Sequence, residues 1–258
     1  MEQASLHGTT DEALPFPRRL ALAVADAGNE TAQFFFSQDE AADHFRSALL
    51  ADLDPRPITQ QFKVELGGDD PTLCFLGKGD WGPFRRAISA TRVFAETRQI
   101  FECGEDFRRT ESYQALLARI RAGDVPVLNH VRMETVAFLD GYFMQTVHMI
   151  ARAKAGGIAR RQESAETPVA DARPEWVERM ERNVGLAIDR DGGLIRVGPG
   201  KHRMAVAKLL GLSSMPFEIR LVHVAWLRRQ MNLRKLPAAR ALRAAISDLT
   251  QSAHGVSS

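Results

Sequence analysis

The segment 198–203, with the sequence GPGKHR, combines two glycines with three side chains that carry or can carry a positive charge. An apolar run precedes it, and the following pattern from Lys201 to Leu210 predicts a helix that ends at Gly211. The first amides of a helix have no partner inside the helix, and the aligned peptide dipoles make that end positive. We therefore expect an anion site at this helix start, with phosphate as the ligand.

The residue types of this segment suit phosphate recognition. Gly198 and Gly200 let the backbone approach a ligand without obstruction from a side chain. Arg203 would supply forked donors, Lys201 a mobile point charge, and His202 a donor or a proton shuttle near neutral pH. These five residues form the predicted nucleotide- or phosphate-binding site, and Arg203 and His202 are also catalytic candidates. The alternative is a tight turn whose charged side chains are only solvated.

Phosphoryl transfer to a hydroxyl also needs a carboxylate that orients or deprotonates the acceptor. Asp189 is the preferred catalytic candidate, because it ends a predicted strand opposite the strand that leads into the segment 198–203. Four other carboxylates could serve but are expected to have structural roles: Asp80, Glu134, Asp140 and Asp191. Trp81 and Trp226 could stack on a base, but we expect both to pack against the core.

The elements that must position these residues are clearest in the last third of the chain. Apolar side chains alternate with small ones over 184–188 and return over 194–197, around an Asp-Gly turn at 189–193. This pattern predicts a β-hairpin. A further strand is expected from Phe217 to Val224, and a final helix from Pro237 to Leu249.

Strand and helix patterns also alternate earlier in the chain, which indicates the α+β class. Short strands are expected at 31–37, 58–66 and 72–76, whereas 18–27 fits either a helix or a buried strand. Helical patterns cover 37–49, 84–122 with a break near Gly104, and 133–155 with a further break at Gly141. A polar stretch at 160–173 predicts a linker, and a short helix is expected from Pro174 to Asn183.

The segments 189–211 and 214–219 resemble the ParB/sulfiredoxin superfamily. Its signature is a strand, a G-x-H-R or G-x-R-R turn, a helix of the form xxAxxxLG and a second strand. The residues that match this signature are Gly200, His202, Arg203, Ala207, Leu210, Gly211 and Pro216. The pattern over 145–158, with its Gly-Gly-Ile ending, resembles the superfamily's preceding helix, and 79–81 resembles an uncharacterised prokaryotic ParB-like subgroup.

The resemblance implies an α+β fold built on a ParB/sulfiredoxin-like mixed-sheet core. That core is expected over residues 126–236. A largely helical N-terminal extension over 13–125 is expected to be integral to the fold, and a basic C-terminal helix is expected over 237–250.

The resemblance also implies a nucleotide or phosphate site at the G-x-H-R turn. Members of the superfamily include CTP-hydrolysing partition proteins, ATP-using sulfiredoxins, free-serine kinases and proteins described as nucleases. Lys201 replaces the sulfiredoxin cysteine, and Pro199 replaces the usual aspartate. No helix-turn-helix pattern of the partition proteins follows Trp226. The resemblance therefore implies an ATP- or ADP-dependent phosphotransferase (a kinase) or an NTPase with a small hydroxylated substrate. Mg²⁺ is a further candidate cofactor, because it binds the phosphates themselves and needs only one or two carboxylates.

Composition limits the remaining classes of protein. The 258 residues include 45% hydrophobic and 26% charged residues, with a formal net charge of +2, as in an ordinary globular protein. Two cysteines, no signal peptide and no long apolar run predict a cytoplasmic protein without a disulfide scaffold or a membrane partner. The histidines show no zinc-binding spacing.

Charge is distributed unevenly along the chain. Residues 201–258 hold 10 Lys and Arg against 2 Asp and Glu. Such a basic end could contact nucleic acid, which leaves a non-catalytic nucleic-acid-binding or nucleotide-sensing module as the alternative function. A helix whose arginines are only solvated is the structural alternative.

Overall fold

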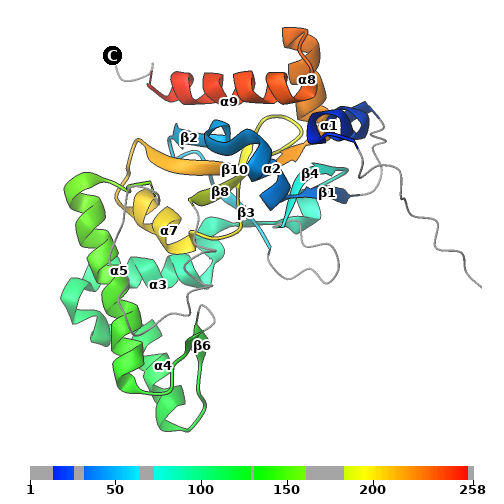
Figure 1. Cartoon of the computed structure of the whole chain (residues 1–258). Coiled ribbons are helices and arrows are strands. Elements are labelled where there is room, and N and C mark those ends of the chain that lie inside the picture. Colours follow the sequence, from blue (N-terminus) through cyan, green and yellow to red (C-terminus); the bar gives the residue numbers. More distant parts are fainter. Residues whose placement is uncertain (1–13, 26–31, 64–72, 129–130, 161–182, 255–258) are drawn as a thin grey trace, which may run out of the picture.

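The computed structural model describes residues 14–25, 32–63, 73–128, 131–160 and 183–254. These residues form a mixed β-sheet with helices on both sides, so the protein belongs to the α+β class that the sequence predicts (Figure 1).

The strand β10 (Met215–His223) is the centre of the sheet and is buried along its whole length. One of its edges pairs in parallel with β8 (Val184–Ile188). Its other edge pairs antiparallel with β2 (Leu50–Leu53) and then in parallel with β4 (Cys74–Lys78). Because neighbours cover both edges and both faces of β10, most of its apolar side chains join the main core, and Leu221 joins a small core on the opposite face.

The sheet continues on both sides of this centre in the order β1-β4-β10-β8-β9-β3-β5. The strand β9 (Leu194–Val197) pairs antiparallel with β8, which confirms the predicted hairpin. The strand β3 (Gln60–Phe62) lies parallel to β9, and β5 (Arg85–Ala87) forms one edge. The strand β1 (Gln33–Ser37) forms the other edge, beside β4.

The N-terminal part of the chain supplies β1 to β5 and therefore completes the sheet. The expected N-terminal extension is less helical than the sequence indicates. The pattern over 37–49 forms the helix α2 (Gln38–Phe45) and a 3₁₀ turn, and β2 follows directly. The pattern over 84–122 begins with a 3₁₀ turn and β5 before any α-helix starts.

Three helices form one group beside the sheet. They are α1 (Phe16–Ala25), α8 (Val224–Arg234) and α9 (Ala238–His254), and Figure 1 shows them together on one side. They contact one another, and α9 also contacts β2. The ambiguous pattern at 18–27 is thus a helix over its described part, and its apolar face joins the main core.

A second group of helices lies on the opposite side in Figure 1. It contains α3 (Arg92–Cys103), α4 (Glu111–Arg121) and α5 (Val136–Gly156), which enclose a separate apolar core. The side chain of a threonine caps the start of each helix by accepting a backbone N–H bond. The helix α5 runs through Gly141 without interruption, contrary to the sequence expectation.

The helix α7 (Lys201–Leu209) joins the two cores. Met204 and Ala207 pack into the main core, whereas Val206 packs into the core of the second helical group. Gly211, with φ of 64°, follows the helix as predicted. The predicted linker at 160–173 and the predicted helix at 174–183 fall almost entirely outside the described residues. No described helix has the length and apolar character needed to cross a lipid bilayer.

The close contact of β8 with β9 leads to the first testable prediction. A Cβ atom at Gly185 would lie 2.3 Å from the carbonyl oxygen of Val197. Because a backbone oxygen in a paired strand cannot move easily, Gly185→Ala should lower the free energy of unfolding by about 1–3 kcal/mol, as overpacking does. Urea unfolding followed by circular dichroism measures this change.

Gly141→Ala is the matched control, because nothing lies within 4 Å of a Cβ at this helical position. It should raise the free energy of unfolding by about 0.5–1 kcal/mol, since alanine loses less backbone entropy than glycine. Equal stabilities of the two variants would contradict the described packing of the hairpin.

Candidate phosphate-binding site at the start of α7

Two glycines turn the chain from β9 into α7. Gly198 has φ of 68° and Gly200 has φ of 89°, a left-handed conformation that glycine adopts without strain. A Cβ at Gly200 would lie 2.7 Å from Cγ2 of Val184, so a larger residue would not fit. Gly200 is the N-cap of α7, and no side chain in the described part of the chain caps this helix start. The first amides of α7 therefore have no side-chain acceptor within the described ranges, and they carry the positive end of the helix.

The guanidinium of Arg196 lies beneath this turn. The residue is only 1% exposed, on a strand whose neighbouring side chains are apolar. Its Nε donates to Oε1 of Gln61 at 3.0 Å, and its Nη1 donates to the carbonyl oxygens of Gly198 and Pro199. Its Nη2 is buried, and no hydrogen-bond partner for it exists among the described residues.

Nothing in the described part of the chain neutralises this charge. Burial, and then the charges of Arg86 and Arg220, lower the pKa of Arg196 to about 10. A buried charge without a counter-ion costs free energy, because the desolvation penalty is not repaid by an opposite charge. An opposite charge close to this guanidinium would offset part of that penalty.

A cross-strand row brings a second arginine to the same face of the sheet. Gln61 on β3 is the register partner of both Arg196 on β9 and Arg86 on β5. Side chains of directly paired residues point to the same face, because the pleats of neighbouring strands are aligned. The next residue on β3, Phe62, belongs to the small core on the opposite face. Arg86, Gln61 and Arg196 therefore share the face that carries α7.

Lys201 is the first residue of α7 and is partly buried. Burial is the largest cause that lowers the pKa of its amine, and the charges of Arg196, Arg86 and Arg92 lower that pKa further. Arg92 is the first residue of α3, a helix that contacts α7. Positive groups from β5, α3, β9 and α7 thus converge near one helix start.

A β-bulge in β10 places a further arginine beside the turn. The register of β10 with β8 shifts between Ile219 and Leu221, at Arg220. The Nη2 of Arg220 donates to Oε2 of Glu218 at 3.0 Å and to the carbonyl oxygen of Asn183 at 3.2 Å. A Cβ at Gly198 would lie 3.3 Å from Nη1 of Arg220, which shows how closely this guanidinium approaches the turn.

A carboxylate, a phenol and an imidazole form a chain at the first turn of α7. Glu96 of α3 is 1% exposed and accepts a hydrogen bond of 2.7 Å from the hydroxyl of Tyr142 on α5. The same hydroxyl lies 3.1 Å from Nε2 of His202, and Nε2 lies 3.8 Å from Oε1 of Glu96. Because the hydroxyl donates its single proton in the hydrogen bond to Glu96, its oxygen can accept a hydrogen bond from the Nε2–H group of His202.

Asp189 does not lie near the start of α7. Its Oδ1 accepts bonds from the amides of Asp191 and Gly193, and its Oδ2 accepts a bond of 3.2 Å from Arg85. It follows the last residue of β8, whereas Val184 at the other end of that strand adjoins Gly200. Five residues of extended strand correspond to about 16 Å. The antiparallel hairpin therefore separates Asp189 from the other predicted site residues.

The remaining carboxylate candidates have structural contacts, as expected. Oδ1 of Asp140 accepts bonds from the hydroxyl of Tyr113 and from Arg108. Asp80 accepts a hydrogen bond from the amide of Gly82. Glu134 pairs with Arg132 at the surface, and Asp191 is an exposed residue of the hairpin turn.

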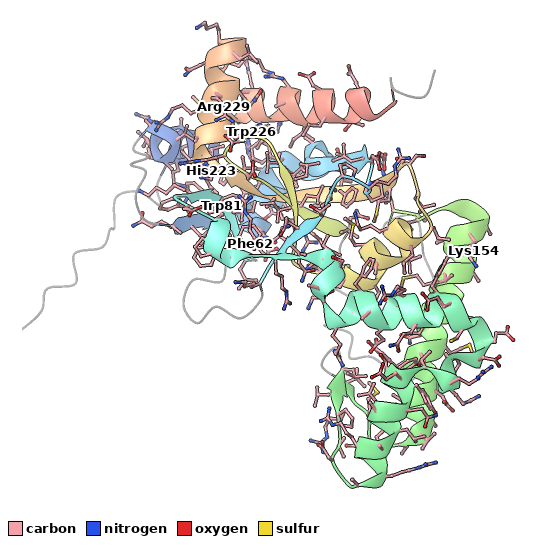
Figure 2. The ribbon with its side chains drawn as sticks, turned by 180° about the vertical axis from the view of Figure 1, so that it is seen from behind. Phe62, Trp81, Lys154, His223, Trp226 and Arg229 are labelled. Carbon is pink, nitrogen blue, oxygen red and sulfur yellow. The ribbon has the colours of Figure 1, made fainter. Side chains whose placement is uncertain are left out.

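The two tryptophans pack in the interior rather than facing the start of α7. Trp81 is 1% exposed, with its ring 5.5 Å from Phe62 and 4.8 Å from His223. Figure 2 shows Trp226, His223, Trp81 and Phe62 following one another along one side of the molecule. The prediction that both tryptophans belong to the core is confirmed.

Arginines of the basic C-terminal end mostly bind within the protein. Arg228 donates to the carbonyl oxygen of Val24, and Arg229 donates to that of Arg190. Arg234 pairs with Asp248, and Arg243 donates to the carbonyl oxygen of His44. These bonds attach α8 and α9 to neighbouring elements. Within the described ranges, no group of three or more His, Cys, Asp or Glu side chains could hold a metal ion.

Comparison of the chain with protein-family models, curated proteins and solved structures finds no match. Gly198 and Gly200 form the turn, and Lys201, His202 and Arg203 are the first three residues of α7, so their closeness follows from the sequence. The sequence analysis missed seven residues at this site: Gln61, Arg86, Arg92, Glu96, Tyr142, Arg196 and Arg220. Of these, Arg196 and Arg220 had a local signal, because each is a charged residue between apolar neighbours in a predicted strand.

The Glu96–Tyr142–His202 chain leads to a prediction about stability. Tyr142→Phe removes the hydroxyl that donates to a fully buried carboxylate. We expect the free energy of unfolding to fall by about 1–3 kcal/mol, because a buried acceptor loses its donor. Denaturant unfolding at neutral pH measures the loss.

Tyr113→Phe is the matched control, since Tyr113 also donates to a carboxylate, Asp140, at 2.7 Å. Asp140 is more exposed and keeps its ion pair with Arg108, so this change should cost only about 0.5–1.5 kcal/mol. If Tyr113→Phe destabilises the protein more than Tyr142→Phe does, the assigned difference in burial is wrong.

The lowered pKa of Lys201 leads to a prediction about pH. Below that pKa the amine is charged in both the folded and the unfolded chain, and the full penalty of burying it applies. As pH rises from this pKa towards the ordinary value of 10.5, the folded chain releases its proton first and the penalty disappears. Lys201→Met should therefore stabilise the protein most at neutral pH, and the gain should shrink across this window.

Unfolding by urea between pH 7 and 10.5 measures the gain at each pH. Lys235→Met, at an exposed position after α8, is the control and should change stability by the same amount throughout. A gain for Lys201→Met that stays constant over the window would contradict the lowered pKa.

Proposed function

We propose that this protein binds a nucleotide or another phosphate compound at the start of α7. We further propose that it is an ATP- or ADP-dependent phosphotransferase, or an NTPase, that acts on a small hydroxylated molecule. One observation carries the proposal: the buried guanidinium of Arg196, without a counter-ion among the described residues, lies under an uncapped glycine turn. Phosphate is the anion that suits a helix start with glycines and converging cations.

Different groups of the site have different roles in binding a phosphate. The amides after Gly200 donate hydrogen bonds to phosphate oxygens, and the guanidinium of Arg196 donates a hydrogen bond to a further oxygen. Lys201 and Arg203 neutralise the charge that develops as the phosphoryl group leaves one oxygen and joins another.

The proposal assigns the acid–base role to the chain of Glu96, Tyr142 and His202. Asp189 is too distant from the turn to take the proton of an acceptor hydroxyl there. His202 lies in the first turn of α7. The hydroxyl of Tyr142 is within hydrogen-bonding distance of both Nε2 of His202 and the carboxylate of Glu96. His202 therefore fixes a phosphate oxygen or receives the acceptor's proton, and Glu96 supports the charge that His202 gains.

Any Mg²⁺ would arrive with the phosphates rather than be held by protein ligands. Two carboxylates in the described part of this region, Glu96 and Glu218, already accept hydrogen bonds from Tyr142 and Arg220. A magnesium ion bound to phosphates keeps several waters and needs few protein ligands. The charge at this site is instead balanced by arginine and lysine.

The resemblance to the ParB/sulfiredoxin superfamily supports this proposal. The order β8, hairpin turn, β9, G-x-H-R turn, α7 and β10 agrees with the order of elements in the superfamily signature. Phosphate binding at that turn is what the resemblance implies. The assignment to this superfamily and the reaction type remain part of the proposal, because a fold by itself does not determine a reaction.

A thermal-shift series with ATP, ADP, CTP and GTP, each with and without Mg²⁺, tests the proposal. At ten times the dissociation constant, a ligand adds about 1.4 kcal/mol to stability, or about 3–6 °C in Tm. Arg203→Ala should abolish the shift. Arg240→Ala removes an exposed charge on α9 and should keep it. The absence of a shift with every nucleotide would overturn the proposal.

The alternative function is a nucleic-acid-binding module. Adding oligonucleotides to the same thermal-shift series distinguishes it from the proposed nucleotide site. Binding through the basic end would weaken steeply as salt is added, because phosphate contacts release counter-ions. The internal bonds of Arg228, Arg229 and Arg243 give this alternative no support. Salt-sensitive oligonucleotide binding that persists in Arg203→Ala would favour it over the nucleotide site.

A further inference from the structure

We infer that the site accepts a chain of at least two phosphates, and that Arg86 and Arg92 of the N-terminal half hold the distal phosphate. The inference rests on the proposed phosphate site at the start of α7 and extends it to a second subsite. The ligand class is a diphosphate or longer polyphosphate group, as in a nucleoside di- or triphosphate.

The cross-strand row places Arg86 where a second phosphate would need it. Arg86 and Arg196 are both register partners of Gln61, one on each side of it. Two strand spacings separate their Cα atoms by about 9.5 Å. Arg86 is exposed at the edge strand, whereas Arg196 is buried beneath the turn. One arginine can therefore hold a phosphate at the turn while the other reaches a neighbouring phosphate nearer to solvent.

Arg92 reaches the same region from another element. It is exposed at the first position of α3, directly after the N-cap Thr91. The helix α3 packs against α7, and Arg92 is close enough to Lys201 to repel its charge. Lys201 also experiences the charges of Arg86 and Arg196, so it lies within the range of all three arginines. This position suits a lysine that bridges two adjacent phosphates.

The charges also match more than one phosphate. Within the described part of the chain, none of Arg86, Arg92, Arg196 and Lys201 forms an ion pair with a carboxylate. A single phosphate group carries about −1.5 to −2 charges. Four positive groups therefore exceed the charge of one phosphate and are balanced by two or three linked ones. A single phosphate would leave the exposed pair, Arg86 and Arg92, without a ligand.

Isothermal titration calorimetry with orthophosphate, pyrophosphate and tripolyphosphate at constant ionic strength tests the inference. The wild-type chain should bind pyrophosphate at least about tenfold more tightly than orthophosphate, because two further charge-assisted contacts form. Arg86→Gln and Arg92→Gln should each remove most of this advantage and leave orthophosphate affinity unchanged. Arg98→Gln, another exposed arginine on α3, is the control and should behave as the wild type.

The outcomes separate this inference from the proposed function. If orthophosphate binds and pyrophosphate binds no more tightly, the distal subsite is refuted while the phosphate site at α7 stands. If Arg86→Gln weakens both anions equally, Arg86 belongs to the first subsite and the assignment is overturned. If no anion binds, the proposed phosphate site fails, and the distal subsite fails with it. Thermal unfolding of each free variant confirms that these exposed substitutions leave the fold intact.

Discussion

The buried guanidinium of Arg196 is the constraint on which the site depends. It holds β3 to β9 through Gln61 and holds the turn at Gly198 through a backbone carbonyl. These bonds satisfy part of the guanidinium but leave its charge without a counter-ion among the described residues. Removing such a charge from water is costly, and the penalty is offset only when an anion shares the site. The same interactions that fix the turn are therefore the basis on which we propose an anion site there.

The location of the site follows from the way in which α7 joins two cores. Met204 anchors the helix to the sheet, and Val206 anchors it to the helical group of α3, α4 and α5. Because both anchors lie within the first two turns, the helix start is held between the sheet and α3. This arrangement brings Arg92 and Glu96 of α3 to a turn that the sheet supplies.

Local signals predicted most of the elements after residue 183, although they gave no range for α8. The Asp-Gly turn predicted the hairpin of β8 and β9, and the apolar pattern predicted α7, β10 and α9, since these patterns can be recognised within a short window of sequence. The short strands β2 and β5 were missed, because three or four residues carry too little periodicity and form only when a partner strand is present. Gly141 did not interrupt α5, since the cost of about 1 kcal/mol is small beside the packing of that helix.

The sequence by itself determined the glycine turn and the charged residues that open α7, because both depend on adjacent residues. Only the tertiary structure decided which distant groups face that turn. Gln61 and Arg196 are 135 positions apart, and their bond requires β3 to lie beside β9, an order that no local pattern specifies. The structure likewise separated Asp189 from the site, because an antiparallel hairpin places its turn at the opposite end from its termini.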